Sequence, residues 1–238
     1  MAACGLAVFV KTPGFSPLKT RLARTLGSAR AVEFHLRSAF AMEALLHRLT
    51  RLETDLNVFW AVAEADALED PLWRGFPRLG QGEGSLGARL SHVFDQLWQE
   101  HEQVIFVGND SPQVSLEVWQ ELLQESQNYS YYLGLTEDGG FYFLSARKNI
   151  PPSVWNKISY SQSTTARALM GELKVLGSVG SGFMSYDVDE GSDLARLARE
   201  NRVGGLLPEQ IDLINWAQEM SEFLAQPGGQ PSCLPPNK

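Results

Sequence analysis

GLAVFVKTPGFSPLKTRLA, residues 5–23, joins an apolar run to a loop that carries cations and then to a helical pattern. The run Gly5–Val10 is short and continuous, which is typical of a strand buried on both faces of a parallel sheet. From Thr20 onward, leucine, alanine and arginine recur at helical spacing. A strand, a loop and a helix in this order predict the opening unit of an α/β domain.

The loop of this unit matches a phosphate-binding P-loop only at Lys19 and Thr20. A P-loop needs glycine at the two positions that here hold Pro13 and Leu18, because glycines let successive backbone N–H groups wrap the phosphates. Proline also removes a backbone donor. The pattern therefore excludes an ATPase of this type.

What remains is a loop with three cations, Lys11, Lys19 and Arg21, at the carboxyl end of the first predicted strand. Ligands bind at that edge of open α/β sheets, and a helix N-terminus there adds its own positive dipole. We interpret this loop as a candidate phosphate-binding site. The alternative is that Lys19 and Arg21 form a solvated first turn of helix.

The rest of the chain continues to alternate between apolar runs and helical patterns. Further strands are expected at 56–62, 104–107, 131–135, 141–146 and 175–179. Helices are expected at 28–52, with Ser28 as N-cap, and at 88–98, 115–125, 161–173, from about 192, and at 208–225. Residues 66–78 are expected to be a loop with short turns. The alternation predicts one α/β domain with a mainly parallel sheet over residues 1–225, and a disordered tail at 226–238.

Composition and charge narrow the class of protein. The net charge of −8 argues against a general binder of nucleic acid or anionic membranes, because phosphate backbones demand a broad basic surface. Only two cysteines, Cys4 and Cys233, are present, so a disulfide framework is not expected. No signal peptide or membrane-spanning run is evident. We therefore expect a cytoplasmic protein. The sequence does not indicate an oligomeric state.

Carboxylates lie at three predicted strand ends. Asp110 follows the run VIFVGN, Asp138 lies in EDGG between two strands, and Asp187 and Asp189 form the motif DVD. Mg²⁺ and Mn²⁺ take oxygen ligands, usually one or two protein carboxylates plus substrate phosphates. Aspartates facing a basic loop fit that demand. Each also has a structural alternative: a turn at Asp110, a hairpin turn at Asp138, and a helix cap at Asp189.

A glycine-rich stretch, GQGEGSLG at residues 80–87, precedes another helical pattern. It offers backbone N–H groups and also a close approach for a flat ring or a ribose, which side chains would otherwise block. The four histidines, His35, His47, His92 and His101, lie in helical patterns without metal-ligand spacing, so we interpret them as surface or core residues. No GxSxG motif supports a serine nucleophile.

Five stretches taken in order resemble a bacterial family of nucleotide-diphospho-sugar transferase-like proteins of the GT-A fold. These are the DUF2064-type glycosyltransferases, which are related to 2-phospholactate and molybdenum-cofactor guanylyltransferases. The stretches are FVKTPGFSPLKTRLA, QGEGSLGARL, VGNDSP, EDGGFYFL and YDVDEGSDL, between Phe9 and Leu194. The resemblance implies a single three-layer α/β/α domain with a mixed, mostly parallel sheet. It also implies a nucleotide in the N-terminal half and an acceptor in the C-terminal half.

The resemblance also implies roles for particular residues. Lys19 and Arg21 would neutralise the phosphates, Asp110 would hold Mg²⁺ or Mn²⁺, and Asp187 or Asp189 would supply a second metal contact. The implied catalytic residues are Asp110, Asp138, Lys19 and Arg21. The implied nucleotide-binding residues are Lys11, Lys19, Arg21, Gly84, Ser85, Gly87 and Asn109, and the acceptor side would comprise Asp138, Gly139 and Gly140.

Two departures from related patterns keep functional alternatives open. An acidic residue in place of Asn109 would complete a fuller DxD-like pair, and the phosphate loop lacks the LxGGxGxR signature of typical sugar nucleotidyltransferases. The expected function is a metal-dependent transferase that joins a nucleotide or nucleotide-sugar donor to a small-molecule acceptor, with glycosyl transfer first. Nucleotidyl transfer with release of pyrophosphate is the alternative. A non-catalytic nucleotide-binding protein and an unrelated α/β domain are the remaining hypotheses.

Overall fold

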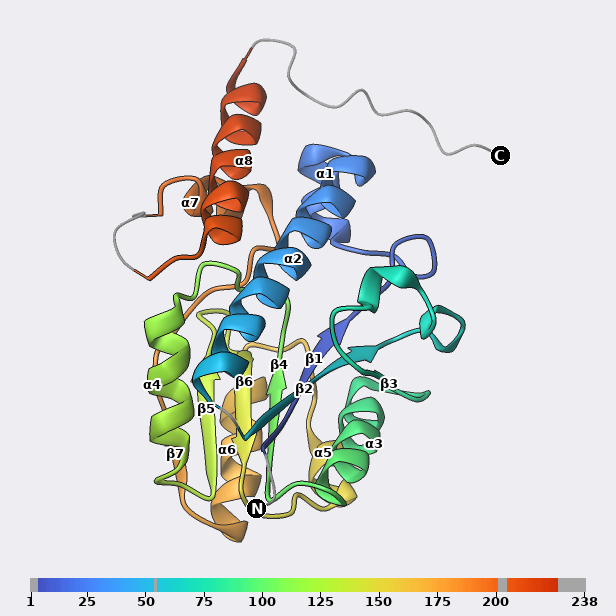
Figure 1. Cartoon of the computed structure of the whole chain (residues 1–238), viewed down its shortest axis with the longest axis vertical. Helices are drawn as coiled ribbons and strands as arrows, with labels where there is room; N and C mark the ends of the chain where they lie inside the picture. The colour runs from blue at the N-terminus through green and yellow to red at the C-terminus, as the bar shows by residue number, and fades with distance from the viewer. Residues whose placement is uncertain (1–3, 54, 201–204, 227–238) are drawn as a thin grey trace.

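The computed structural model describes residues 4–53, 55–200 and 205–226. These residues form a seven-stranded sheet with the order β3-β2-β1-β4-β6-β5-β7, and helices lie around it (Figure 1). The strands are β1 Cys4–Val10, β2 Leu56–Val62, β3 Arg78–Gly80, β4 Gln103–Val107, β5 Tyr131–Leu135, β6 Phe141–Ala146 and β7 Val179–Ser181.

The sheet is mixed but mostly parallel. Strand β1 pairs in parallel with β2 and β4, β2 pairs in parallel with β3, and β5 pairs in parallel with β7. Strand β6 lies antiparallel between β4 and β5, so it alone among the described strands runs in the opposite direction. The predicted fold class is confirmed, and the carboxyl ends of β1 and β4 lie side by side at one edge of the sheet.

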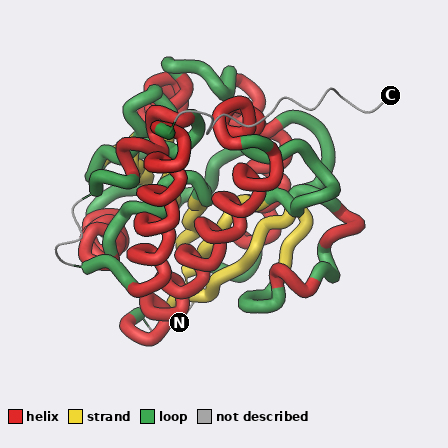
Figure 2. The backbone as a smooth tube through the Cα atoms, turned by 90° about the horizontal axis from the view of Figure 1, so that it is seen from above, coloured by secondary structure: helices red, strands yellow, loops and turns green. Residues whose placement is uncertain are grey.

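Helices cover both faces of the sheet, and Figure 2 shows the strands among them from above. Apolar side chains form one buried cluster on each face of the sheet. Helices α2 and α4 contribute to the cluster on one face, and α3, α5 and α6 contribute to the cluster on the other. The helices are α1 Thr20–Leu26, α2 Ser28–Leu52, α3 Leu86–Trp98, α4 Leu116–Ser126, α5 Pro152–Lys157, α6 Thr165–Leu176, α7 Gly191–Leu197 and α8 Pro208–Ala225, with short 3₁₀ turns at Ala65–Ala67 and Pro71–Trp73.

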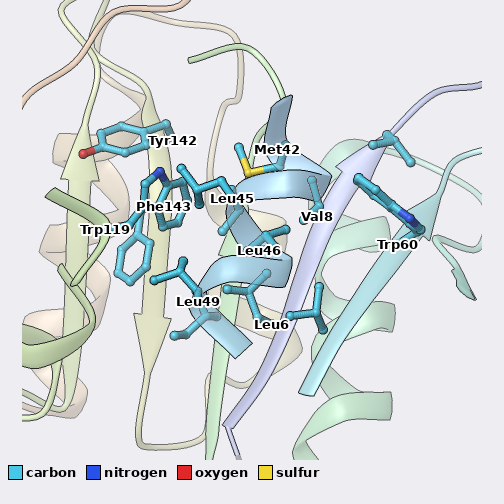
Figure 3. Packing of buried hydrophobic residues seen from close by; sticks show 14 of the residues in the cluster. Leu6, Val8, Met42, Leu45, Leu46, Leu49, Trp60, Trp119, Tyr142 and Phe143 are labelled. Carbon is cyan, nitrogen blue, oxygen red and sulfur yellow. The ribbon is translucent and has the colours of Figure 1, made fainter. Parts of the chain in front are cut away.

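Alternation along β1 explains why the sheet is buried on both faces. Leu6 and Val8 pack in the cluster that contains Leu45 and Leu46 of α2, as Figure 3 shows, whereas Ala7 belongs to the cluster on the other face. Leu6, Ala7 and Val8 have no exposed surface. Burying a side chain the size of leucine or valine is worth about 2 kcal/mol, so this strand anchors both layers.

A third apolar cluster lies beyond the carboxyl ends of the strands, where α1, α7 and α8 gather (Figure 1). Leu22 of α1, Phe34 of α2, Leu194 of α7 and Trp216 of α8 are all buried in it. Val188, in the segment before α7, is buried in the same cluster. This packing carries residues 187–189 back to the loop that follows β1.

The bounds of several helices and strands differ from those predicted. The expected strand 175–179 is wrong: α6 continues to Leu176, Val175 is 84% exposed, and Gly177 ends the helix, so that β7 starts at Val179. The short strand β3 and helix α5 were not predicted, because three to six residues carry too little periodicity. Gly27, with φ of 83°, is the N-cap of α2 in place of Ser28.

Two further expectations concern the chain as a whole. The tail expected to be disordered, 226–238, lies outside the described residues from position 227 onward. None of the helices in the described part of the chain combines the length and apolar character needed to cross a membrane.

Candidate functional site

Three segments that are distant in sequence meet at the carboxyl edge of the sheet. The loop after β1 carries Lys19, the segment after β4 carries Asp110, and the segment before α7 carries Asp189. The backbone N–H of Val188 donates to the carbonyl oxygen of Asp110 at 2.8 Å and fixes the last two segments against each other. The predicted convergence of the basic loop with strand-end aspartates is therefore seen in the structure.

Lys19 lies at the centre of this meeting point. Its side chain is only 5% exposed, and its Nζ lies 2.7 Å from Asp110 Oδ1 and 3.0 Å from Asp189 Oδ1. Nζ also donates to the carbonyl oxygen of Val188 at 2.7 Å. The backbone of Lys19 is left-handed, with φ of 42°, which costs a non-glycine residue about 1–2 kcal/mol. The three contacts hold the residue in this unfavourable conformation.

The protonation states follow from this ion pairing. Burial alone would lower the pKa of Lys19, but the carboxylates of Asp110 and Asp189 outweigh it, so the pKa is raised above its ordinary value. Burial would likewise raise the pKa of Asp110, but the charge and hydrogen bond of Lys19 outweigh it, so the pKa is lowered. Both groups stay charged at neutral pH.

Arg21 is the more accessible cation of the predicted KTR motif. It pairs with Asp189 Oδ2, and its side chain remains 56% exposed. Asp189 therefore has a cation on each oxygen, Lys19 on one and Arg21 on the other. Lys19 is buried, so it is not part of a solvated helix turn. Arg21 lies in the first turn of α1 and is largely exposed, so that alternative holds for it in part.

Two adjoining cavities open at this edge. The loop cavity, about 410 Å³, is lined by residues that include Lys11, His35, Gln81 and Asn109. The hairpin cavity, about 520 Å³, is lined by residues that include Asp138, Phe141, Tyr160, Ser161 and Asp187. Both cavities are lined by Phe9, Arg21, Leu86, Gly108, Asp110 and Asp189.

Asp187 lines the hairpin cavity, and among the described residues no cation forms an ion pair with its carboxylate. Its Oδ1 accepts a hydrogen bond of 2.7 Å from Ser111 Oγ. Burial and the negative charge of Asp110 raise the pKa of Asp187 to about 7, despite the opposing effects of Ser111 and Lys19. Asp110 and Asp187 are therefore neighbouring carboxylates that repel each other when both are ionised.

The donor set of this pair suits a hard divalent cation. Mg²⁺ is commonly held by one or two carboxylates together with substrate phosphates, and Asp110 and Asp187 line one cavity. No three His, Cys, Asp or Glu side chains among the described residues are grouped so that they could hold a metal ion by themselves. The oxygens of Asp189 are already bound to Lys19 and Arg21. Metal binding by Asp110, Asp187 and Asp189 stays a prediction.

Asp138 occupies the turn between β5 and β6. Its Oδ1 accepts from Thr136 Oγ1 at 2.5 Å and from the backbone N–H of Gly140 at 3.0 Å. Gly139 has φ of 89°, and a Cβ there would lie 2.0 Å from the carbonyl oxygen of Ser163. The hairpin-turn interpretation of this motif is confirmed. The turn also places Asp138 and Gly140 in the lining of the hairpin cavity, whereas their role on the acceptor side stays a prediction.

The predicted nucleotide-binding residues divide into two groups. Lys11, Lys19, Arg21 and Asn109 line the loop cavity. Within the described part of the chain, the cavity linings do not include Gly84, Ser85 or Gly87.

The second group has structural roles. Ser85 caps α3 by accepting from the backbone N–H of Ala88 at 3.3 Å. A Cβ on Gly87 would lie 2.6 Å from the carbonyl oxygen of Trp155, so this glycine permits close packing of α3 against α5. Leu86, between them, lines both cavities.

Several residues that line the cavities were not predicted as site residues, among them His35, Gln81, Tyr160 and Ser161. His35 was interpreted as an ordinary helix residue, and its spacing gives no sign that α2 brings it to the loop cavity. Gln81 lies inside the glycine-rich stretch, so that stretch was the available signal. Ser161, with φ of 57°, and Lys19 are the non-glycine residues with positive φ among those described, and both line a cavity.

A family model matches the middle part of the chain. The model of the DUF2064 family, described as an uncharacterized protein conserved in bacteria, matches residues 45–162. This segment, just under half of the chain, is similar to the DUF2064 family. The matched region includes Gln81, Asp110 and Asp138, whereas the cationic loop and Asp189 lie outside it. No curated protein sequence matches the chain.

Solved structures of similar fold support the fold assignment. A protein from Desulfovibrio desulfuricans G20, provisionally described as a nucleotide-diphospho-sugar transferase, is 24% identical with a TM-score of 0.74, over 91% of this chain and 99% of that one. The 4-diphosphocytidyl-2C-methyl-D-erythritol synthase of Anaerococcus prevotii DSM 20548 is 9% identical with a TM-score of 0.53, over 91% and 99% of the two chains. The nucleotide-diphospho-sugar transferase fold is thereby confirmed.

Proposed function

We propose that the chain is a transferase whose donor is a nucleotide-sugar and that it transfers the glycosyl group to a small acceptor. The observation that carries the proposal is the pair of adjoining cavities that share Arg21, Asp110 and Asp189. A transferase must hold a donor and an acceptor on two sides of one reacting centre. Two cavities joined at charged residues fit that requirement.

The loop cavity suits the nucleotide diphosphate of the donor. Lys11 and Arg21 are exposed cations in its lining, and Lys19 offsets the charges of Asp110 and Asp189. A leaving diphosphate gains negative charge as the bond to the sugar breaks, and fixed positive groups stabilise it. Arg21, which lines both cavities, is the residue that would contact this diphosphate.

The hairpin cavity suits the sugar and the acceptor. Phe141 and Tyr160 supply aromatic surface against which the C–H faces of a sugar can pack, and Asp138 supplies a carboxylate. One oxygen of Asp138 is held by Thr136 and Gly140, so the carboxylate is oriented. Its other oxygen is the proposed acceptor for the proton of an attacking hydroxyl.

A divalent cation is part of the proposal. Asp110 and Asp187 are the residues that would hold Mg²⁺ or Mn²⁺, which would add positive charge at the leaving diphosphate. In the free protein, Lys19 contacts Asp110 Oδ1, so the second oxygen of Asp110 and the carboxylate of Asp187 remain for this role. Lys19 is then a positioning residue that holds Asp110 at the edge of both cavities.

Nucleotidyl transfer is the second candidate, because the same cations would stabilise a leaving pyrophosphate and because the fold is shared with the Anaerococcus synthase. Product analysis separates the two. We would incubate the full chain and Mn²⁺ with UDP-glucose or GDP-mannose and a set of small hydroxyl-bearing acceptors, or with a nucleoside triphosphate and a sugar phosphate, and compare each reaction with one that lacks the acceptor. Release of a nucleoside diphosphate supports glycosyl transfer, and release of pyrophosphate supports nucleotidyl transfer.

Two variants sharpen this experiment. Asp110→Asn should abolish product release, whereas Asp95→Asn, at an exposed carboxylate on α3, should leave it unchanged. Release of neither product from any donor contradicts both transfer reactions. Binding of a nucleotide without any release would favour a non-catalytic nucleotide-binding protein.

A further inference from the structure

The lining of the loop cavity includes a buried glutamine, Gln81, whose side-chain amide makes hydrogen bonds only through its nitrogen. Gln81 directly follows β3 and is 5% exposed. Its Nε2 donates to the carbonyl oxygens of Val10, at 3.2 Å, and Ala61, at 2.8 Å. Carbonyl oxygens only accept, so these contacts identify Nε2 as the donor atom and fix the orientation of the amide.

This orientation leaves Oε1 as a fixed acceptor. Among the described residues, Oε1 has no hydrogen-bond partner, and it is not one of the fully enclosed atoms that lack partners. Gln81 lines the loop cavity, so the remaining access of Oε1 is to that cavity. A ligand that meets this atom must bring a donor, because an unpaired acceptor shielded from water costs about 1–3 kcal/mol.

His35 shows the same arrangement in the same cavity. The side chain is 5% exposed, and its Nε2 lies 2.9 Å from the carbonyl oxygen of Lys11, so Nε2 carries the proton. Burial lowers the pKa of His35, and the neutral ring then presents Nδ1 as an acceptor. Nδ1 has no partner among the described residues. Two buried side chains therefore use their donors on the backbone and keep acceptors for the cavity.

We propose that Gln81 determines which nucleobase the loop cavity accepts, and that it selects bases with an exocyclic amino group, which donates to Oε1. This inference rests on the proposed function. A ribose hydroxyl both donates and accepts, so it needs no fixed acceptor. An amino group only donates and therefore matches an amide whose own N–H bonds are already used. The apolar side chains of Val10, Leu18 and Leu86 in the same lining provide surface for a flat ring.

Pairs of nucleotides that differ in the exocyclic amino group test this proposal, and the guanosine–inosine pair differs in that group alone. We would titrate the full chain, with Mg²⁺, with cytidine and uridine 5′-diphosphates, with adenosine and inosine 5′-diphosphates, and with guanosine and inosine 5′-diphosphates. The wild-type chain should bind the amino-bearing member of at least one pair about tenfold more tightly, because a buried acceptor would otherwise remain unpaired. Gln81→Met should reduce that ratio to about one.

Gln103→Met is the matched control. The Nε2 of Gln103 also makes two hydrogen bonds, to Ser126 Oγ and Ser145 Oγ, but it lies at the amino end of β4, away from the cavity. This variant should lose stability like Gln81→Met and keep the base preference. If the wild-type chain binds both members of every pair equally, or if Gln81→Met keeps the base preference, the role of Gln81 is overturned and the proposed function is not. Binding of no nucleotide overturns the proposed function with it.

Discussion

At the scale of single residues, Lys19 explains most of the electrostatics of the site. It is buried, its backbone is strained, and both of its carboxylate partners come from segments more than ninety residues away along the chain. A buried cation is stable only while its carboxylate partners are present, because the Lys19 ammonium group left alone would be poorly solvated. Removing this residue is therefore a direct test of how the three segments are held together.

We predict that Lys19→Met lowers the free energy of unfolding by about 2 kcal/mol, which is less than for a fully buried pair, because the side chains of Asp110 and Asp189 lose their cation but are 44% and 27% exposed to water. Urea denaturation at neutral pH measures this value. Lys148→Met, at an exposed lysine, should change it by no more than about 0.5 kcal/mol. A Lys19→Met variant as stable as Lys148→Met would show that the ion pairs contribute little to folding.

Asp187 provides a prediction about pH. Its pKa in the folded chain, about 7, lies above its ordinary value of 3.8, so the folded state binds the proton more tightly than the unfolded state. The raised pKa therefore reduces stability progressively as pH rises from about 4 to about 7. Asp187→Asn keeps an acceptor for Ser111 and removes the charge.

We expect Asp187→Asn, in a chelator, to be stabilised relative to the wild type by roughly 3 kcal/mol more at pH 8 than at pH 4.5. Thermal or urea unfolding at the two pH values measures the difference. A stability difference between the two proteins that does not change with pH would mean that Asp187 titrates normally.

Residue types were predictable at this site, but their contacts were not. The sequence placed Asp110 just after an apolar run, and Lys19 and Arg21 between the first strand and the helical pattern that follows it. It could not show that Lys19 binds both Asp110 and Asp189, because the position of the 187–189 segment depends on how α7 and α8 pack. Gln81 and His35 were not predicted as site residues for a different reason. A single polar residue in a glycine-rich loop or in a helix has no distinctive spacing.

At the scale of elements, the turn between β5 and β6 positions Asp138. We predict that Gly139→Ala destabilises the chain much more than Gly14→Ala. Both glycines have nearly the same φ, 89° and 87°, so the backbone penalty of about 1–2 kcal/mol is shared. Only at Gly139 would the new Cβ collide with a backbone atom, the carbonyl oxygen of Ser163.

Urea denaturation of the two alanine variants isolates the steric part of this effect. We expect an additional loss of about 2 kcal/mol for Gly139→Ala, within the range of severe backbone substitutions. Equal losses in the two variants would show that the turn can move away from Ser163 without penalty.

Long elements were predictable from the sequence, and short ones were not. The strand Leu56–Val62 and the helix Pro208–Ala225 have the predicted bounds, because apolar runs and an N-terminal proline mark them clearly. The strand expected at 175–179 failed because its valine and leucine residues also continue the helical spacing of α6, and Gly177 decides where the helix ends. The intrinsic preference of these residues for strand or helix does not by itself decide between a strand at 175–179 and a longer α6.

At the scale of the whole molecule, the sheet and the helical layer above it have separate tasks. The sheet brings the ends of β1 and β4 together, and the cluster formed by α1, α7 and α8 holds the third acidic segment over them. The alternation of strands and helices was enough to predict one α/β domain with a mainly parallel sheet, and the family resemblance implied its three layers. The helical layer was not predictable, because nothing in its amphipathic patterns states which surface each helix covers.

The central claim is that a nucleotide-activated donor binds beside Asp110. Isothermal titration calorimetry of the full chain with UDP-glucose and GDP-mannose, in Mn²⁺ and then in a chelator, tests it most directly. We expect binding of at least one donor in Mn²⁺ that weakens about tenfold or more in the chelator and in Asp110→Asn, and not in Asp95→Asn. Binding of neither donor, or binding that is indifferent to both Mn²⁺ and Asp110→Asn, would contradict it.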